Sequence, residues 1–306
     1  MTVLLTRSDV DRAVDVDEVL EVLAEGFRAP APAQPPLRVR TELPGPGTAT
    51  CLMPGLLPGV PAYTVKVNAK FPAASPALRG VVCLHDLETG ELLALADSAA
   101  VTAWRTGLAA ALGTHLLADP DAGTLGFVGA GAQARVVAAG LRRLRAWREV
   151  VATDLDPGRA AALGALPLES ASAVPQAADV VVLATWSRRP LLRADEVRPR
   201  QHLTTLGADE PGKVELPADL LLASRVVVDD RALAAASGAL GNVGLEAGVA
   251  AGTLGDVLRG DLPGRDGTDL PTVYAPVGLP WQDLALLWTV YRRVSRAEAT
   301  IIDLLG

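Results

Sequence analysis

One stretch of the chain restricts the possible fold more than any other: residues 124–141 read TLGFVGAGAQARVVAAGL. An apolar run is followed by Gly129 and Gly131 and then by a helical pattern, which predicts a buried strand, a tight turn and a helix. Ala134 stands at the third position of the dinucleotide-binding fingerprint, where a small residue lets the helix pack on the strand. The first turn of such a helix presents backbone N–H groups to a pyrophosphate.

A carboxylate further along the chain supports this interpretation. The next apolar run ends at Asp154, about twenty residues beyond the loop, where a carboxylate can bind the ribose hydroxyls of NAD and repel the 2′-phosphate of NADP. The residue after it is Leu155 and not an arginine. We therefore predict an NAD site. The pattern leaves one alternative open, a structural strand–helix turn with a helix-capping aspartate.

Strands and helices alternate through the region that we assign to residues 119–280. After the first strand come the apolar runs EVVATD, ADVVVLAT, HLTTLGA and RVVVDD, with helical segments between them. This alternation predicts an α/β fold in which a doubly wound parallel sheet is covered by helices on both faces, the Rossmann arrangement. At 306 residues the chain also exceeds one ordinary core. We expect a second, discontinuous domain over residues 1–118 and 281–306.

The second domain reads as a mixture of helices and antiparallel strands. A helix capped by Ser8 is expected, with apolar residues at helical spacing from Val16 to Phe27. A hairpin around a Pro-Gly turn and a second hairpin around Thr89-Gly90 follow. A long helix then begins at Asp97 or Ser98. The segment from residue 280 to the end reads as an amphipathic helix that folds back against the N-terminal domain.

Composition excludes several classes of function. The net charge of −7 argues against binding to nucleic acid or to an anionic membrane. The two cysteines, Cys51 and Cys83, and the three histidines are too far apart in sequence for a metal site or a disulfide framework, so no metal is expected. No signal peptide and no apolar run long enough to span a membrane are recognised. We expect a cytoplasmic protein.

Five motifs, in the same order as in one known family, make the hypothesis more specific. They are MPG at Met53, YTVKVN around Lys66, ADSAAVTAWRTGLAAALG around Arg105, GAGAQA with Gln133, and LGADEPGKVEL around Asp209. In these motifs the chain resembles the ornithine cyclodeaminase/μ-crystallin family from about residue 35 to residue 290. The resemblance implies a Rossmann domain with NAD as cofactor, a discontinuous α+β domain for substrate binding and dimerisation, a homodimer, and a small amino acid or imino acid as substrate.

The resemblance also implies how the substrate carboxylate is bound. Lys66 matches the family's lysine that contacts the carboxylate, and Arg105 matches an arginine that reaches both carboxylate and cofactor. A further family arginine corresponds to either Arg38 or Arg40, which lie on one face of the first hairpin by their spacing. A strand-surface lysine and a salt-bridged helix arginine are the structural alternatives for Lys66 and Arg105.

The family's catalytic carboxylate matches Asp209, which we place at the carboxyl end of a parallel strand, where α/β sheets bind their ligands. It would act as general base, with Lys66 as the second catalytic residue; an ordinary loop aspartate is the alternative. The other expected cofactor contacts are Thr106, Gly129, Gly131, Ala132, Gln133, Asp154 and Thr185.

The family members interconvert an amine and an imine beside a carboxylate by hydride transfer to or from a nicotinamide. The resemblance favours a cyclodeaminase of the ornithine type, with a ketimine reductase or an alanine-type amino-acid dehydrogenase as the alternative. A non-catalytic protein that binds nucleotide and a small ligand is the alternative of another class, although Asp209 argues against it. Pro276, where relatives have serine, and the short C-terminal region weaken the transfer of ornithine specificity.

Overall fold

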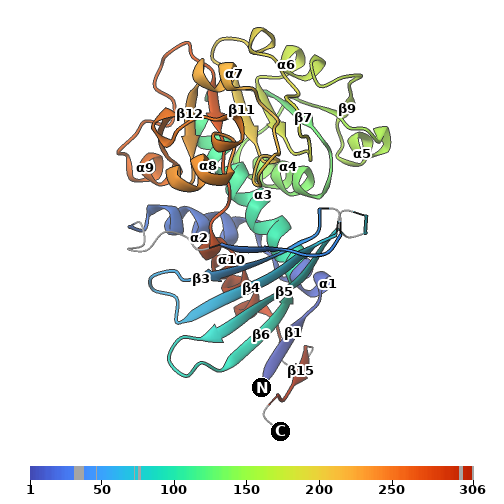
Figure 1. Ribbon diagram of the computed structural model, residues 1–306, viewed down its shortest axis with the longest axis vertical. Helices are drawn as coiled ribbons and strands as arrows, with labels where there is room; N and C mark the ends of the chain where they lie inside the picture. Colours follow the sequence, from blue (N-terminus) through green and yellow to red (C-terminus); the bar gives the residue numbers. More distant parts are fainter. Residues whose placement is uncertain (31–37, 46, 72, 75–76, 296–298, 305–306) are drawn as a thin grey trace. The chain divides into compact units, whose positions relative to one another are not determined.

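The computed structural model describes residues 1–30, 38–45, 47–71, 73–74, 77–295 and 299–304. The chain forms two compact units. Unit 1 comprises Met1–Thr106 and Leu279–Gly306, and unit 2 comprises Gly107–Gly278 (Figure 1). The domain ranges expected from the sequence, and their assignment to substrate and cofactor, remain predictions.

Unit 1 contains a seven-stranded sheet in the order β15-β1-β6-β5-β4-β3-β2. Both predicted hairpins are present as antiparallel pairs, β2 with β3 and β5 with β6. The pairing of β1 with β6 is parallel. The strands are β1 Thr2–Leu5, β2 Val39–Glu42, β3 Ala49–Gly55, β4 Ala62–Lys70, β5 Leu78–Asp86, β6 Leu92–Asp97 and β15 Thr300–Ile302.

Helices α1 (Arg7–Ala13), α2 (Val16–Arg28) and α10 (Pro280–Arg293) belong to this unit. The expected cap at Ser8 is wrong, because Thr6 caps α1 and Asp15 caps α2. Helix α10 packs along α2, where the Phe27 and Trp281 rings meet edge to face at 5.0 Å. The expectation of one helix from residue 280 to the end is wrong. Helix α10 ends at Arg293, and the β-branched residues Thr300–Ile302 instead pair with β1 as an antiparallel strand.

Helix α3 (Ser98–Leu117) begins directly after β6 and runs through the division between the two units. Its start is capped as the sequence suggested: the Asp97 side chain accepts a hydrogen bond from the Ala100 amide at 2.7 Å. Its length does not make it a membrane span, because no helix among the described residues is both long and apolar enough to cross a bilayer.

Unit 2 contains an eight-stranded sheet in the order β13-β12-β14-β11-β10-β7-β8-β9, and every strand pairing in it is parallel. The predicted Rossmann fold is thus confirmed, and the five strands read from the sequence are present. Three short strands were not predicted. The strands are β7 Thr124–Val128, β8 Glu149–Thr153, β9 Leu166–Pro167, β10 Val180–Leu183, β11 His202–Thr205, β12 Arg225–Val228, β13 Ala250–Thr253 and β14 Thr272–Tyr274.

Both faces of this sheet are covered, which explains the continuous apolar runs. In β10, Val180 and Val182 pack into one buried cluster, while Val181 and Leu183 pack into the cluster on the opposite face. The helices that cover the sheet are α4 Ala132–Leu144, α5 Pro157–Ala162, α6 Ala173–Ala177, α7 Ala218–Leu222, α8 Arg231–Ser237 and α9 Leu254–Arg259, together with the second half of α3.

The strand order reverses at β7, which lies between β8 on one side and β10 on the other. The chain builds outward from β7 in both directions, so the β7/β10 boundary is the topological switch point of the sheet. Open α/β sheets bind ligands just outside the carboxyl ends of the strands at this point. A ligand site is therefore expected at the segments that follow β7 and β10.

Candidate active site

The segment after β7 has a backbone that requires glycine at one position. Gly129 has φ of +88°, a conformation that L side chains rarely adopt. A Cβ there would lie 2.7 Å from the Ala184 carbonyl oxygen, which follows β10. The β7 turn thus packs directly against the end of the neighbouring strand, as a dinucleotide-binding turn at a switch point does.

Gly131 is a glycine for a different reason. A Cβ on this residue would have no atom of the described chain within 4 Å, so the space in front of it is open. Gly131 is the N-cap of α4, and no side chain in the described structure caps that helix end. Its first N–H groups therefore point toward open space with the positive end of the helix dipole, which fits a pyrophosphate.

Two predicted cofactor residues carry buried polar atoms that have no hydrogen-bond partner within the part of the chain described here. They are Oε1 of Gln133, in the first turn of α4, and Oγ1 of Thr106 in α3. An unpartnered buried oxygen is costly unless a ligand completes its hydrogen bonds. Both atoms are consistent with a bound polar cofactor.

Asp154 follows β8 and contacts the loop itself. Its carboxylate accepts hydrogen bonds from the Ala130 amide at 2.7 Å and from the Asp156 amide at 2.9 Å. Each carboxylate oxygen keeps a second lone pair that a ribose hydroxyl could use. Nη1 of Arg159, one turn into the next helix, lies 3.9 Å from Asp154, a neighbour that inspection of Leu155 alone missed.

Thr185, which follows β10, is bound to a carboxylate that the sequence reasoning did not single out. Glu215 accepts hydrogen bonds at 2.7 Å from both the amide and the hydroxyl of Thr185, and at 2.7 and 2.8 Å from the Thr205 hydroxyl and the Gly207 amide. Burial raises the pKa of Glu215, although the four hydrogen bonds oppose that shift. Glu215 thereby ties the ends of β10 and β11 together. It is the second of two glutamates in the LGADEPGKVEL motif.

The predicted general base, Asp209, lies in the segment after β11, where its side chain is 40% exposed. Its carboxylate accepts a hydrogen bond at 2.7 Å from Nζ of Lys213, a residue that the sequence reasoning also missed. Lys213 lies 3.6 Å from Glu210 and 5.4 Å from the centre of the Trp186 ring. Burial disfavours the charge on Lys213, but the two carboxylates raise its pKa overall.

In unit 1, two of the predicted carboxylate-binding residues converge on one buried carboxylate. Nζ of Lys66, on β4, lies 2.9 and 3.0 Å from the two oxygens of Asp283 on α10. Nε of Arg105, on α3, lies 3.2 Å from Asp283, and its Nη1 lies 3.0 Å from Oε1 of Gln282. All four side chains are almost completely buried.

Burial and the neighbouring charges shift the pKa of Lys66 strongly. Burial lowers the pKa of Lys66 to about 8; Asp283 opposes this shift, while the positive charges of Arg105 and Arg38 add to it. Three cations therefore act on one another here, and Asp283 is the anion paired with two of them. Lys66 and Arg105, both buried, share this one carboxylate, an arrangement suited to a second carboxylate brought by a ligand.

Strand register distinguishes the two hairpin arginines that the sequence left equivalent. Met53 is paired with Lys66, and Val39 with Leu52, so Arg38 extends the row that contains Lys66. Arg40 is paired with Cys51 two rows further along, and its Nη1 lies 3.2 Å from Glu42 in an exposed ion pair.

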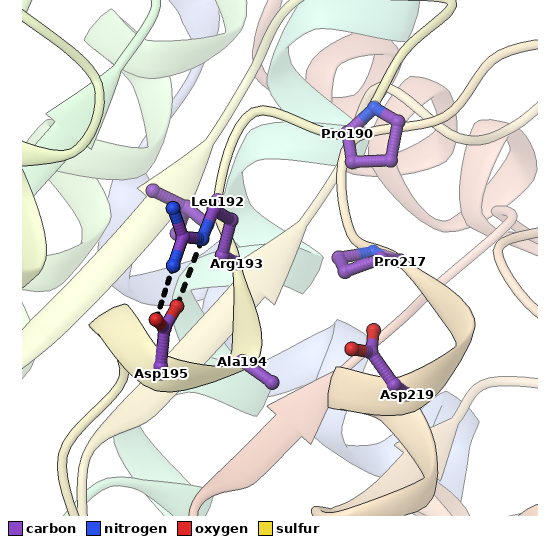
Figure 2. Close-up of a pocket in the computed structure, with 7 residues that line it drawn as sticks. All are labelled: Pro190, Leu192, Arg193, Ala194, Asp195, Pro217 and Asp219. Atoms are coloured by element: carbon purple, nitrogen blue, oxygen red, sulfur yellow. Dashed lines mark hydrogen bonds and ion pairs between the residues drawn. The ribbon is translucent and has the colours of Figure 1, made fainter.

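A separate hollow of about 400 Å³ on unit 2 has none of the predicted site residues in its lining (Figure 2). Its charged side chains are already engaged, since Arg193 binds both oxygens of Asp195 and Asp219 accepts from the Leu220 amide. We assign it no function. The hollow is lined by Pro190, Leu192, Arg193, Ala194, Asp195, Pro217 and Asp219.

Fold and loop together define this chain as a two-unit α/β protein with a dinucleotide-binding type of Rossmann unit. The family model of the ornithine cyclodeaminase/mu-crystallin family matches residues 1–298, and the chain belongs to that family. The resemblance found in the motifs is confirmed.

Three relatives illustrate the range of activities in the family. A solved archaeal alanine dehydrogenase dimer with bound NAD has a TM-score of 0.91 and 29% identity, covering 99% of each chain. The Δ1-pyrroline-2-carboxylate reductase of Thermococcus litoralis, solved with NADH and L-proline, has a TM-score of 0.89 and 25% identity, covering 98% of this chain and 100% of that one. The L-lysine cyclodeaminase of Streptomyces rapamycinicus is 34% identical over 257 residues, 76% of this chain and 73% of its own.

Proposed function

We propose that this chain catalyses NAD-dependent interconversion of an amine and an imine at the α carbon of a small amino acid. The observation that carries the proposal is the buried cluster of Lys66 and Arg105 around Asp283, with Arg38 acting on it. A carboxylate adjacent to the reacting carbon is the feature that such a cluster recognises.

Different residues of the chain bind the substrate and the cofactor. Lys66, Arg105 and Arg38 bind the substrate carboxylate, since all three charges act on one buried position. Arg40 is the weaker candidate for the third cation, because it is exposed and paired with Glu42. A planar guanidinium binds both carboxylate oxygens at once and so fixes the orientation of the α carbon.

On unit 2, the α4 N-terminus with Gly131, Ala132 and Gln133 would hold the pyrophosphate of NAD, and Asp154 the adenosine ribose. When bound, NAD accepts or donates the hydride. Relatives solved with NAD and with NADH support the choice of cofactor. Thr106, Arg105 and Thr185 are further proposed contacts, with Thr185 fixed in place by Glu215.

Asp209 is the proposed general base, which takes a proton from the attacking amine or from water. Its ion pair with Lys213 orients the carboxylate while leaving it partly exposed. Lys66 can serve as the second proton-transfer group because the pKa of its ammonium is lowered to about 8, close to neutral pH.

The residues described above can support two variants of the reaction. Net oxidoreduction, as in an amino-acid dehydrogenase or an imine reductase, is favoured by the match to the alanine dehydrogenase over nearly the full length of both chains. A redox-neutral cyclodeamination, in which the hydride returns to a ring imine and ammonia leaves, is the second candidate. The 34% identity to the lysine cyclodeaminase favours it.

We propose further that the protein is a homodimer. Val39, Leu52, Val67 and Val81 form one row across four neighbouring strands of the unit 1 sheet, and each is between 38 and 44% exposed. An apolar row of this kind on an outer sheet face is suited to burial against another chain. The dimeric state of the alanine dehydrogenase relative supports the same proposal.

A single assay tests the reaction. The purified protein is incubated with alanine, lysine, ornithine or a cyclic imino acid, with NAD or NADH, while NADH absorbance and ammonia are both followed. A net change in NADH identifies a dehydrogenase or reductase, and ammonia without net NADH identifies a cyclodeaminase. Tight NAD binding without turnover of any of these substrates would show a non-catalytic binding protein and overturn the proposal.

A further inference from the structure

Asp283 has no role in the proposed chemistry, yet it is the most heavily committed side chain of the carboxylate site. It lies in the first turn of α10, is fully buried, and binds the Lys66 ammonium with both oxygens. It also accepts from Nε of Arg105, while its neighbour Gln282 accepts from Nη1 of the same guanidinium.

This arrangement fixes two cations with one helix turn. Oε1 of Gln282 also accepts a hydrogen bond from the Leu279 amide at 3.2 Å, so the Gln282 side chain is itself anchored to the start of α10. The Arg105 guanidinium is therefore held at two of its nitrogens and cannot rotate freely. A group that holds both cations before the ligand arrives reduces the ordering cost of binding.

The Asp283 carboxylate also affects the protonation of Lys66. The described charged groups that act on Lys66 are Asp283 from α10, Arg105 from α3, and Arg38 next to β2. The two arginines and burial all favour the neutral amine, and Asp283 alone favours the ammonium. A neutral Lys66 would offer a ligand carboxylate no charge.

We propose that Asp283 is the positioning residue of the carboxylate site, which orients Arg105 and keeps Lys66 protonated at neutral pH. The inference rests on the proposed carboxylate-binding role of Lys66 and Arg105. It predicts that carboxylate affinity is pH-dependent through Lys66 and that Asp283 sets the pH at which the affinity is lost.

The direction of this pH dependence follows from the positive charge that a carboxylate ligand requires on Lys66. Below a pH of about 8 Lys66 is protonated and binds the carboxylate; above it, affinity declines as the ammonium loses its proton. In Asp283→Asn the stabilising charge is gone, so the decline moves to lower pH. In Lys66→Arg the guanidinium stays charged throughout, so the decline disappears.

The experiment measures the affinity of propionate, a carboxylate that does not titrate between pH 6 and 10, by calorimetry on the full chain. Wild type, Asp283→Asn, Lys66→Arg and the double variant are compared. We expect a midpoint near pH 8 for wild type. We expect a midpoint at least about one unit lower for Asp283→Asn, which makes binding at pH 8 at least about fivefold weaker, since wild type is half protonated there. We expect no midpoint for either variant that carries arginine.

Gln282→Leu is the matched control, because it removes a buried contact to Arg105 from the same helix turn without touching Lys66. It should weaken binding at every pH and leave the midpoint unchanged. An unchanged midpoint in Asp283→Asn, or a midpoint that persists in Lys66→Arg, overturns the role of Asp283. If Asp283→Asn does not fold, the comparison of wild type with Lys66→Arg still decides whether Lys66 titration governs binding. Failure of wild type to bind propionate at any pH would instead refute the carboxylate site itself.

Discussion

Two glycines of one loop should respond to the same substitution in opposite ways. In Gly129→Ala the new methyl group must be accommodated at φ of +88°, which costs about 1–2 kcal/mol. It would also lie 2.7 Å from the Ala184 oxygen, an overlap that adds about 1–3 kcal/mol. A total of about 2–5 kcal/mol lowers the Tm of a domain of this size by roughly 5–15 °C.

Gly131→Ala should behave differently. Its φ is −77°, and the added methyl group meets open space, so the loss is that of a weaker N-cap, below about 1 kcal/mol. The methyl group would, however, occupy the space in which we place the pyrophosphate. We therefore expect near-normal Tm but NADH affinity lowered at least about tenfold, or about 1.4 kcal/mol.

Thermal unfolding and NADH fluorescence titration on the two variants and wild type provide the test. Gly131→Ala with unchanged NADH affinity would refute the placement of the cofactor at the α4 N-terminus. Gly129→Ala with wild-type Tm would refute the claim that the turn requires glycine. Loss of affinity in Gly129→Ala alone would decide nothing, because a distorted turn weakens binding by either route.

Three further outcomes are expected. Glu215→Gln should lower the free energy of unfolding by about 1–3 kcal/mol in a urea titration, because an amide cannot accept from all four donors; an unchanged midpoint contradicts the linking role. Asp154→Ala should reduce the preference for NADH over NADPH at least severalfold in kcat/KM, whereas a constant ratio would remove Asp154 from the ribose site. Burial lowers the pKa of His202 to about 3, so folding stability should fall by about 1.4 kcal/mol per pH unit as pH drops below about 6.5, where only the unfolded state gains the proton. His202→Gln should show a shallower fall between pH 6.5 and 5 in urea titrations, and an identical slope would contradict this reasoning.

The sequence predicted those parts of the fold that depend on local patterns. The Rossmann strands are continuous apolar runs because both sheet faces are buried. The loop requires glycine at Gly129 because the positive φ and the nearby Ala184 carbonyl exclude a side chain there. Strands β1 and β15 were missed since each is short and becomes a strand only by pairing with a distant segment. The sequence could not separate Arg38 from Arg40 for the same reason. Their spacing puts both on one face of the hairpin, and only the pairing with distant strands shows which of them lies in the row of Lys66.

The two carboxylates that organise the proposed site, Asp283 and Glu215, could not be recognised for a related reason. Nothing in the sequence around either residue marks it, because the donors that bind it lie far away in the chain. Lys66 is 217 residues from Asp283, and Thr185 is 30 residues from Glu215. A buried carboxylate is unfavourable alone and stable only with several donors, so its presence implies that those donors are fixed. In this chain the donors are predicted ligand contacts, namely Lys66 and Arg105 in unit 1 and Thr185 in unit 2. The buried acids therefore hold these predicted contacts in place, which is why we expect their loss to affect binding geometry and pH dependence as well as stability.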